Sequence, residues 1–184
     1  MALPPSGERL SATPGRRCAL ISGLGFGGNH SHLVVELPER RTRPDQKSTN
    51  SQAFFLSART TEGLRILQQR LARFLRETPE LTSEDVVYTL LLGRDAEAER
   101  AVFMAENLDT LAGQLESGTP LLQGRAADMT FSFGSDEEDR RWLRSHLRSG
   151  NWQKLATLWC QGFNFSWDAI SDELPGRLVT LPPT

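Results

Sequence analysis

A glycine-rich segment near the N-terminus constrains the fold of this chain more than any other feature. Residues 23–28 read G-L-G-F-G-G and match the dinucleotide-binding pattern G-x-G-x-x-G. That pattern requires a helix to begin at the glycines, so that its N-terminus faces the pyrophosphate. Residues 33–35, Leu-Val-Val, follow instead and favour extended chain. Since residues 17–22 are also strand-like, we predict two strands around a tight glycine turn, with no bound nucleotide.

The histidines and cysteines do not form a recognisable catalytic or metal-binding set. His30 and His32 alternate along the second expected strand and so share a face. A zinc site takes three or four protein ligands, and no third ligand lies at a suitable spacing, since His146 falls on the outer part of an expected helix. Neither Cys18 nor Cys160 lies in a sequence motif typical of a catalytic cysteine. The sequence also lacks the G-x-S-x-G motif that carries the nucleophilic serine of many acyl-transferring enzymes. We therefore expect no catalytic, cofactor-binding or metal-binding residue.

Composition narrows the class of protein further. The 184 residues carry 21 Lys and Arg against 23 Asp and Glu, a net charge of −2, which excludes a broadly basic nucleic-acid binder. No apolar run approaches the ~18–20 residues of a membrane span, and the N-terminus does not read as a secretory signal. Two distant cysteines are no disulfide framework. We expect a cytoplasmic protein with no membrane and no nucleic-acid partner.

The middle of the chain predicts an α+β fold. A strand begins at Ala53, and a helix follows over residues 61–77, with an apolar stripe formed by Leu64, Leu67, Leu71 and Phe74. Thr82 can cap a second helix that ends at Gly93, and Asn107 a third that ends at Gly118. Further strands are expected over residues 100–105 and 128–133. This order predicts a small three-stranded sheet with helices packed on it.

The last third of the chain predicts a short helical extension. Ser135 and Glu138 have the spacing of a capping box, with a helix to about residue 148. A second helix over residues 152–160 and an extended tail from residue 174 follow. All four tryptophans lie in this region, where packing into the core is favoured over a role as surface anchors for a partner: Trp142, Trp152, Trp159 and Trp167.

The chain thus divides into four parts. Residues 1–37 hold the two strands, residues 38–52 a polar linker, residues 53–134 the α/β domain, and residues 135–184 the helical extension and tail. Two strands around a turn cannot form a core by themselves. We therefore expect residues 53–134 to fold alone and residues 1–37 to fray without a partner.

Several segments, in order, resemble the C-terminal end of polyketide ketosynthases and the linker domain that follows it. Residues 21–36 (I-S-G-L-G-F-G-G-N-H-S-H-L-V-V-E) are similar to the ketosynthase run S-S-F-G-F-G-G-T-N-A-H-V-V-L-E. Residues 55–60 and 80–94 resemble the linker motifs L-S-A-K-T and D-V-A-Y-T-L-Q-x-G-R. Residues 155–167 and 176–182 are similar to L-A-x-L-W-x-x-G-x-x-x-D-W and R-R-V-x-L-P-T-Y-P-F.

The resemblance implies a set of site residues, and the sequence departs from the family pattern directly after them. Phe26, Gly27 and Gly28 match the loop that lines the ketosynthase pocket, whereas the family's threonine and asparagine become Asn29 and His30. The nucleophilic cysteine and the two catalytic histidines of ketosynthases lie upstream of the stretch resembled here. The resemblance therefore implies that this chain does not condense acyl chains alone, and it implies no cofactor.

The spacing of these motifs implies a synthase served by a separate, trans-acting acyltransferase. A built-in acyltransferase would place several hundred residues before the final motif, and here the gap is short. In such modules the linker is a docking, or flanking, subdomain. The implied function is a non-catalytic structural and docking module of a multienzyme for antibiotic biosynthesis. It would pack beside a ketosynthase, from a homodimeric parent, and recruit the acyltransferase or an acyl carrier protein. The alternative is that the chain completes a ketosynthase active site in trans.

One helix face suggests where such a partner would bind. The expected helix over residues 61–77 has a polar, basic flank opposite its apolar stripe, formed by Arg65, Gln69, Arg73 and Arg76. Such a face is usually only hydrated, but its charge also suits an acidic partner. We take these four residues as the candidate docking set.

Overall fold

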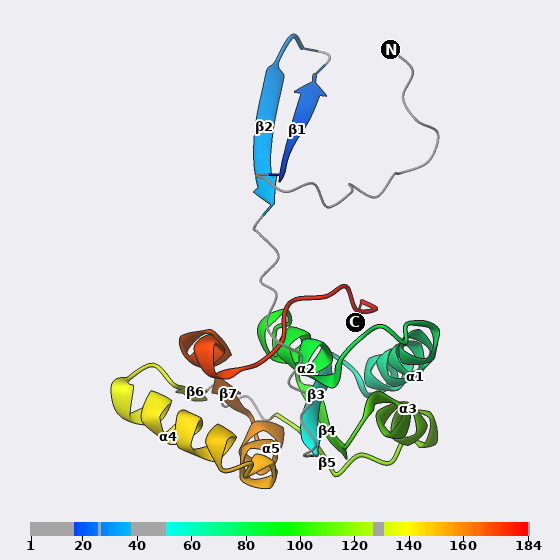
Figure 1. Ribbon diagram of the computed structural model, residues 1–184, viewed down its shortest axis with the longest axis vertical. Helices are drawn as coiled ribbons and strands as arrows, with labels where there is room; N and C mark the ends of the chain where they lie inside the picture. The colour runs from blue at the N-terminus through cyan, green and yellow to red at the C-terminus, as the bar shows by residue number, and fades with distance from the viewer. Residues whose placement is uncertain (1–16, 26, 38–50, 127–130, 184) are drawn as a thin grey trace. The chain divides into compact units, whose positions relative to one another are not determined.

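The computed structural model describes residues 17–25, 27–37, 51–126 and 131–183. The chain separates into two units, Met1–Asp45 and Gln46–Thr184, which are considered one at a time (Figure 1). Within the described residues, no helix is both long enough and apolar enough to cross a membrane.

The first unit contains a two-stranded antiparallel hairpin. Strands β1 (Arg17–Leu24) and β2 (His30–Leu37) pair in register from Arg17 opposite Leu37 to Leu24 opposite His30. The turn closes through the Gly25 amide, which donates to the Asn29 carbonyl at 2.8 Å. Gly28 has φ +81°, a left-handed conformation that glycine adopts without strain. The predicted glycine turn is confirmed, and no helix begins at these glycines.

The second unit is built on a three-stranded antiparallel sheet in the order β3-β4-β5, formed by β3 (Gln52–Ala58), β4 (Glu99–Ala105) and β5 (Leu122–Arg125). Helices α1 (Thr61–Glu77) and α3 (Leu108–Ser117) cover one face, and α5 (Trp152–Cys160) packs on the other (Figure 1). Because helices cover both faces, β3 is buried along its whole length. The predicted α+β fold is confirmed.

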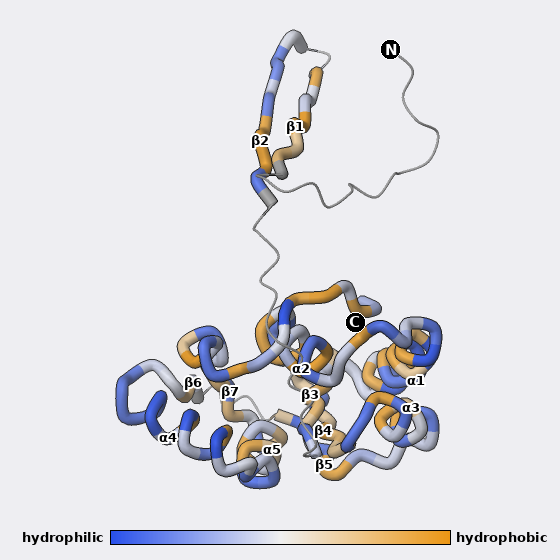
Figure 2. Tube along the Cα trace, viewed as in Figure 1, coloured by the Kyte–Doolittle hydropathy of each residue, from blue (hydrophilic) through white to orange (hydrophobic). Residues whose placement is uncertain are grey.

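The helix ends follow the predicted capping residues. Thr82 accepts the amide of Asp85 at the start of α2 (Ser83–Leu92), and Asn107 accepts the amide of Thr110 at the start of α3. Helix α3 ends at Gly118 with φ +63°. The expected stripe of α1 packs inward: Leu64, Leu67 and Leu71 are buried and Phe74 is half-buried. Apolar residues concentrate in the strands and in α2, whereas α4 (Glu137–Arg148) is almost wholly hydrophilic (Figure 2).

The strand predicted over residues 128–133 is not the third strand of this sheet. That place belongs to β5, which returns from Gly118 directly beside β4 and pairs Leu122 with Val102. Of the predicted segment, residues 128–130 lie outside the described residues, and β6 (Phe131–Phe133) pairs in parallel with β7 (Phe163–Phe165) in a separate two-stranded sheet. The prediction was wrong because the Phe-rich run carries a stronger strand pattern than the short L-Q-G-R segment that the α3 turn delivers to the sheet edge.

The start of α4 also differs from the prediction. Asp136, not Ser135, is the N-cap, and its carboxylate accepts the amide of Asp139 at 2.8 Å. The capping pair is therefore shifted by one residue. The carboxylate of Asp139 reaches back to the Gly134 amide at 3.0 Å, and Arg140 donates to the Ser135 carbonyl.

The tryptophan-rich extension packs against the outer face of the sheet. Phe55 on β3 contacts Trp152, Trp159 and Trp167, the last at the start of the 3-10 helix η1 (Trp167–Glu173). Trp159 and Trp167 are buried, while Trp142 and Trp152 are half-buried against the core. Core packing, the favoured interpretation of these residues, is confirmed.

Candidate functional site

The hairpin exposes large apolar side chains on both of its faces. The pairing register places Leu20 and Val34 on one face and Ile21 and Leu33 on the other. Their exposed fractions are 67, 67, 56 and 58% respectively. Exposed apolar patches of this kind mark interaction surfaces, and a lone two-stranded hairpin is only marginally stable in water. The hairpin is therefore a candidate interaction surface.

The polar residues of the described hairpin include a side-chain contact between His32 and Ser22. His32 Nδ1 lies 2.9 Å from the Ser22 hydroxyl across the strand pair, and His30 is exposed. In the part of the chain that the structure covers, no three His, Cys, Asp or Glu side chains could jointly hold a metal ion. Gly27 and Gly28 lie in the exposed turn, while Phe26 lies outside the described residues.

The candidate docking residues of α1 lie together on its exposed side, but two of the arginines are already paired. Arg65 donates to Glu62 at 2.9 and 2.6 Å, and Arg76 donates to Glu116 of α3 at 2.7 and 2.8 Å. The hydrogen bond from Arg76 lowers the pKa of Glu116 below its ordinary value. Among the residues described, Arg73 has no ion-pair partner.

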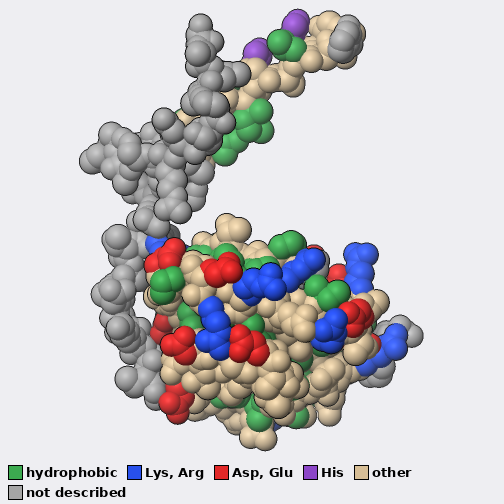
Figure 3. All heavy atoms as spheres, turned by 90° about the vertical axis from the view of Figure 1, so that its right-hand side faces the viewer, with side chains coloured by type: hydrophobic (Ala, Val, Ile, Leu, Met, Phe, Trp, Pro, Cys, Tyr) green, Lys and Arg blue, Asp and Glu red, His purple; other side chains and the backbone are tan. Residues whose placement is uncertain are grey.

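The space-filling view agrees with this partial neutralisation. On the side of the molecule where α1 and α3 lie, basic and acidic side chains are interspersed and no single sign dominates (Figure 3). The face that the sequence predicts to be basic therefore carries charges of both signs. In the sequence, Gln69 and Arg73 lie between the two paired arginines, Arg65 and Arg76.

The C-terminal strap, residues 176–182, lies across α2 and is held by three polar side chains. The carboxylate of Asp85 accepts the backbone N–H of Arg177 at 3.0 Å. The Thr89 hydroxyl accepts the amide of Val179 at 3.0 Å and donates to the Asp85 carbonyl. Arg94 donates to the carbonyl of Pro182. Two segments that the sequence analysis treated separately, residues 80–94 and 176–182, therefore form one contact.

Sequence reasoning missed this contact, although a signal was present. Asp85, Thr89 and Gly93 recur at a spacing of four, which places them on one side of a helix. The strap comes close at both ends: a Cβ at Gly176 would collide with the carbonyl of Glu84, and one at Gly93 would lie 3.2 Å from Leu178. A row of polar and small residues on a helix is the pattern expected where an extended segment lies against it.

A buried arginine ties the sheet to the extension. Arg100 is 2% exposed, and its guanidinium donates to the carbonyls of Glu97, Trp159 and Phe163 and to the side chain of Asn164. Burial lowers the pKa of Arg100 from its ordinary value. The neighbouring thiol of Cys160 is also buried, which raises its pKa to about 11. These groups are structural, because the four hydrogen bonds of Arg100 satisfy buried or partly buried oxygens.

Comparison with known proteins agrees with the motifs. Residues 52–115 match the family described as CurL-like, PKS C-terminal. Polyketide synthase PksL of Bacillus subtilis is 26% identical over 187 residues, which cover 95% of this chain and 4% of that protein. The chain therefore spans only a small part of such relatives.

Solved structures extend the likeness to the fold. The oxazolomycin ketosynthase domain OzmH KS7 of Streptomyces albus is 27% identical, with a TM-score of 0.55 over 96% of this chain and 27% of that one. The ketosynthase from module 1 of the bacillaene synthase of Bacillus amyloliquefaciens gives a TM-score of 0.62 at 24% identity, over 91% and 30% of the two chains. The resemblance inferred from the motifs is confirmed: the chain is similar to the C-terminal, ketosynthase-like region of polyketide synthases.

Proposed function

We propose that this chain is a non-catalytic structural and docking module of a polyketide synthase, whose hairpin completes the body of a ketosynthase. The observation that carries the proposal is the hairpin with large apolar side chains on both faces. A hairpin of a surface sheet would bury one face and expose a polar one. Strands that are apolar on both sides are typical of a sheet covered by further layers on each side.

The free edges of the hairpin support the same conclusion. Strand β1 pairs only with β2 among the described residues, so each strand has one edge beside which no further described strand lies. Such edges are templates for pairing with another chain. A ketosynthase body that lacks its last strands offers the matching sheet edge and the two covering layers.

The test is reconstitution with a ketosynthase that ends before the segment resembling residues 21–36. We expect the two chains to elute together in size-exclusion chromatography. Replacing Leu20 and Val34 by Asp should abolish the complex, because it places charges on one buried face. Replacing the exposed Leu178 of the second unit by Asp is the control and should leave it intact. Absence of any complex with the unmodified chain would refute the proposal.

A second candidate, completion of a ketosynthase active site in trans, is favoured by the turn itself. Gly27 and Gly28 lie in a tight turn between the strands, at the positions that match the ketosynthase pocket loop. The reconstituted complex distinguishes the two functions. Acyl-chain condensation by the complex, compared with the truncated ketosynthase alone, would assign the second function. A stable complex without condensation would leave only the structural one.

The second unit would then serve as the docking side, in the cytoplasm, for a trans-acting acyltransferase or an acyl carrier protein. The short distance between the linker motifs and the strap supports the trans-acting type, since no acyltransferase is interposed. The free guanidinium of Arg73 on α1 supplies the charge for an acidic partner. In this proposal Arg65 and Arg76 shape the face through their ion pairs more than they contribute net charge.

A further inference from the structure

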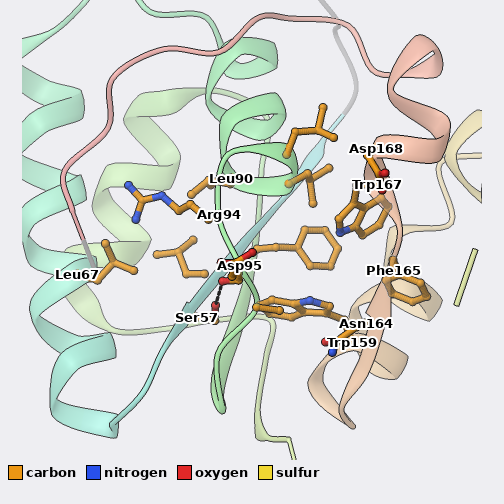
Figure 4. Close-up of a pocket in the computed structure, with 15 residues that line it drawn as sticks. Ser57, Leu67, Leu90, Arg94, Asp95, Trp159, Asn164, Phe165, Trp167 and Asp168 are labelled. Carbon is orange, nitrogen blue, oxygen red and sulfur yellow. Dashed lines mark hydrogen bonds between the residues drawn. The ribbon is translucent and has the colours of Figure 1, made fainter. Parts of the chain in front are cut away.

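A cleft of about 430 Å³ lies in the second unit, between the end of α2 and the segment formed by β7 and η1. Its walls are aromatic and aliphatic: Phe55, Trp159, Phe165 and Trp167 on one side and leucines of α1 and α2 on the other (Figure 4). This volume is within the range of small-ligand sites. None of the residues that line the cleft belongs to the hairpin strands or to the candidate docking set.

Two carboxylates border the cleft from different elements. Asp95 follows α2, and Asp168 belongs to η1; both side chains are exposed. In the described part of the chain neither carboxylate has an ion-pair partner. Arg94 also lines the cleft, but its guanidinium donates to the carbonyl of Pro182 and extends away from Asp95 and Trp159 (Figure 4). Arg94 keeps its positive charge, but with two carboxylates against one guanidinium the lining is negative overall.

The aromatic wall already stacks with a guanidinium within the protein. The Arg100 guanidinium lies 4.9 Å from the centre of the Trp159 ring. Arg100 does not line the cleft, and its donors are taken by four oxygen acceptors. The indole of Trp167 also lines the cleft, but it is 7% exposed and contacts the rings of Phe55 and Phe165, so only a small part of it is accessible to a cation.

We propose that this cleft binds an arginine side chain presented by a partner polypeptide. A guanidinium is flat and weakly hydrated, so it stacks on indole rings, and its fork of N–H donors matches a carboxylate. The cleft supplies the carboxylates of Asp95 and Asp168 at its border and the accessible parts of the Trp159 and Trp167 indoles in its wall. This site is independent of the proposed ketosynthase contact, so either can fail without the other.

The test is an NMR titration of the ¹⁵N-labelled full chain with N-acetyl-arginine amide. The matched control is N-acetyl-citrulline amide, which has nearly the same shape but no charge. We expect saturable shifts of the indole N–H resonances of Trp159 and Trp167, with a Kd on the order of millimolar, as for a single anchored side chain. Equal shifts with the citrulline compound, or no shifts with either compound, would overturn the proposal.

Single substitutions test the role of the two carboxylates, and a third compound distinguishes a polypeptide partner from a small molecule. Asp95→Asn and Asp168→Asn, both at exposed positions, should each weaken binding of the arginine compound by about threefold. Glu80→Gln, an exposed change outside the cleft, should leave it unchanged. Free L-arginine should bind no more tightly than the amide, because its net charge is the same and the α-ammonium and α-carboxylate have opposite effects beside the two aspartates. Tighter binding of the free amino acid would instead indicate a small-molecule site and contradict the polypeptide partner.

Discussion

Asp85 on α2 holds Arg177 on the C-terminal strap by two hydrogen bonds, although the residues lie 92 positions apart in the sequence. One carboxylate oxygen accepts the backbone N–H at 3.0 Å, and the other accepts the side-chain Nε at 3.3 Å. The Asp85 side chain is 8% exposed and that of Arg177 is 48% exposed. The backbone N–H of residue 177 would donate to Asp85 with any side chain at that position except proline. Asp85 therefore contributes more to the stability of this contact than the Arg177 side chain does.

Asp85→Ala should lower the free energy of unfolding of the second unit by about 1–3 kcal/mol, because it leaves a partly buried amide of the strap without an acceptor. Arg177→Ala should cost less than about 1 kcal/mol, since it removes only a half-exposed ion pair. Urea unfolding followed by tryptophan fluorescence measures both, because all four tryptophans lie in this unit. Equal losses would contradict the dominant role of the backbone contact.

Gly176→Ala should destabilise the protein more than Gly150→Ala. Both glycines have positive φ, at +108° and +67°, so both substitutions strain the backbone. Only at Gly176 would the new Cβ also collide with the Glu84 carbonyl, whereas nothing lies within 4 Å at Gly150. The difference in thermal unfolding midpoint between the two variants reports this close approach. Similar midpoints would mean that the strap moves away without cost.

The contact between α2 and the C-terminal strap could not be predicted in full from sequence patterns. Periodicity identified α1 and α2, and capping residues such as Thr82 and Asn107 fixed where helices begin, because these signals are local. The partner of Asp85 is not local. The spacing of Asp85, Thr89 and Gly93 indicates a helix side against which an extended segment can lie, but it does not indicate that this segment contains residue 177.

Arg100→Lys should lower the free energy of unfolding by about 2–4 kcal/mol. Lysine keeps the charge but cannot reproduce the fork of donors that satisfies four oxygen acceptors at once. The control is Arg125→Lys, at a side chain that is 76% exposed and pairs with Glu99 at 3.5 Å. That variant should unfold within about 0.5 kcal/mol of the unmodified protein in urea. A comparable loss in both variants would show that Arg100 contributes no more than a surface arginine.

Stability should fall as the pH rises from 9 towards 11 because of Cys160. Burial raises the pKa of its thiol from 9.0 to about 11, so over this range the folded chain keeps a proton that the unfolded chain loses. The unfolded state then binds fewer protons, and the free energy of unfolding decreases with pH, by about 2–3 kcal/mol in all. Urea unfolding at several pH values measures the slope. Cys160→Ala should flatten it, and an unchanged slope in that variant would assign the effect to other groups.

The candidate docking residues lie on the exposed side of α1, where ion pairs neutralise two of the arginines, and the binding of a partner to this face stays a prediction. Helical spacing places Arg65 and Arg76 on the exposed side of α1, and this is where they lie. The ion pair between Arg76 and Glu116 joins two helices that are 40 positions apart in the sequence, so it depends on the packing of α3 against α1. The pair of Arg65 with Glu62 is local and could have been read from their spacing of three.

Arg73→Glu should therefore weaken the binding of the partner more than Arg65→Glu does. The proposed partner is either the separate, trans-acting acyltransferase or an acyl carrier protein of the same synthase. Arg65 is already neutralised by Glu62, whereas Arg73 keeps its charge for a partner. We expect a two- to fivefold rise in Kd for Arg73→Glu, the size of an exposed charge contact, and a further rise in the double variant. Biolayer interferometry at low salt measures the Kd values, with the exposed Arg141→Glu on α4 as a control of equal charge. If Arg141→Glu weakens binding as much as Arg73→Glu, the effect is one of net charge and α1 is not the docking face.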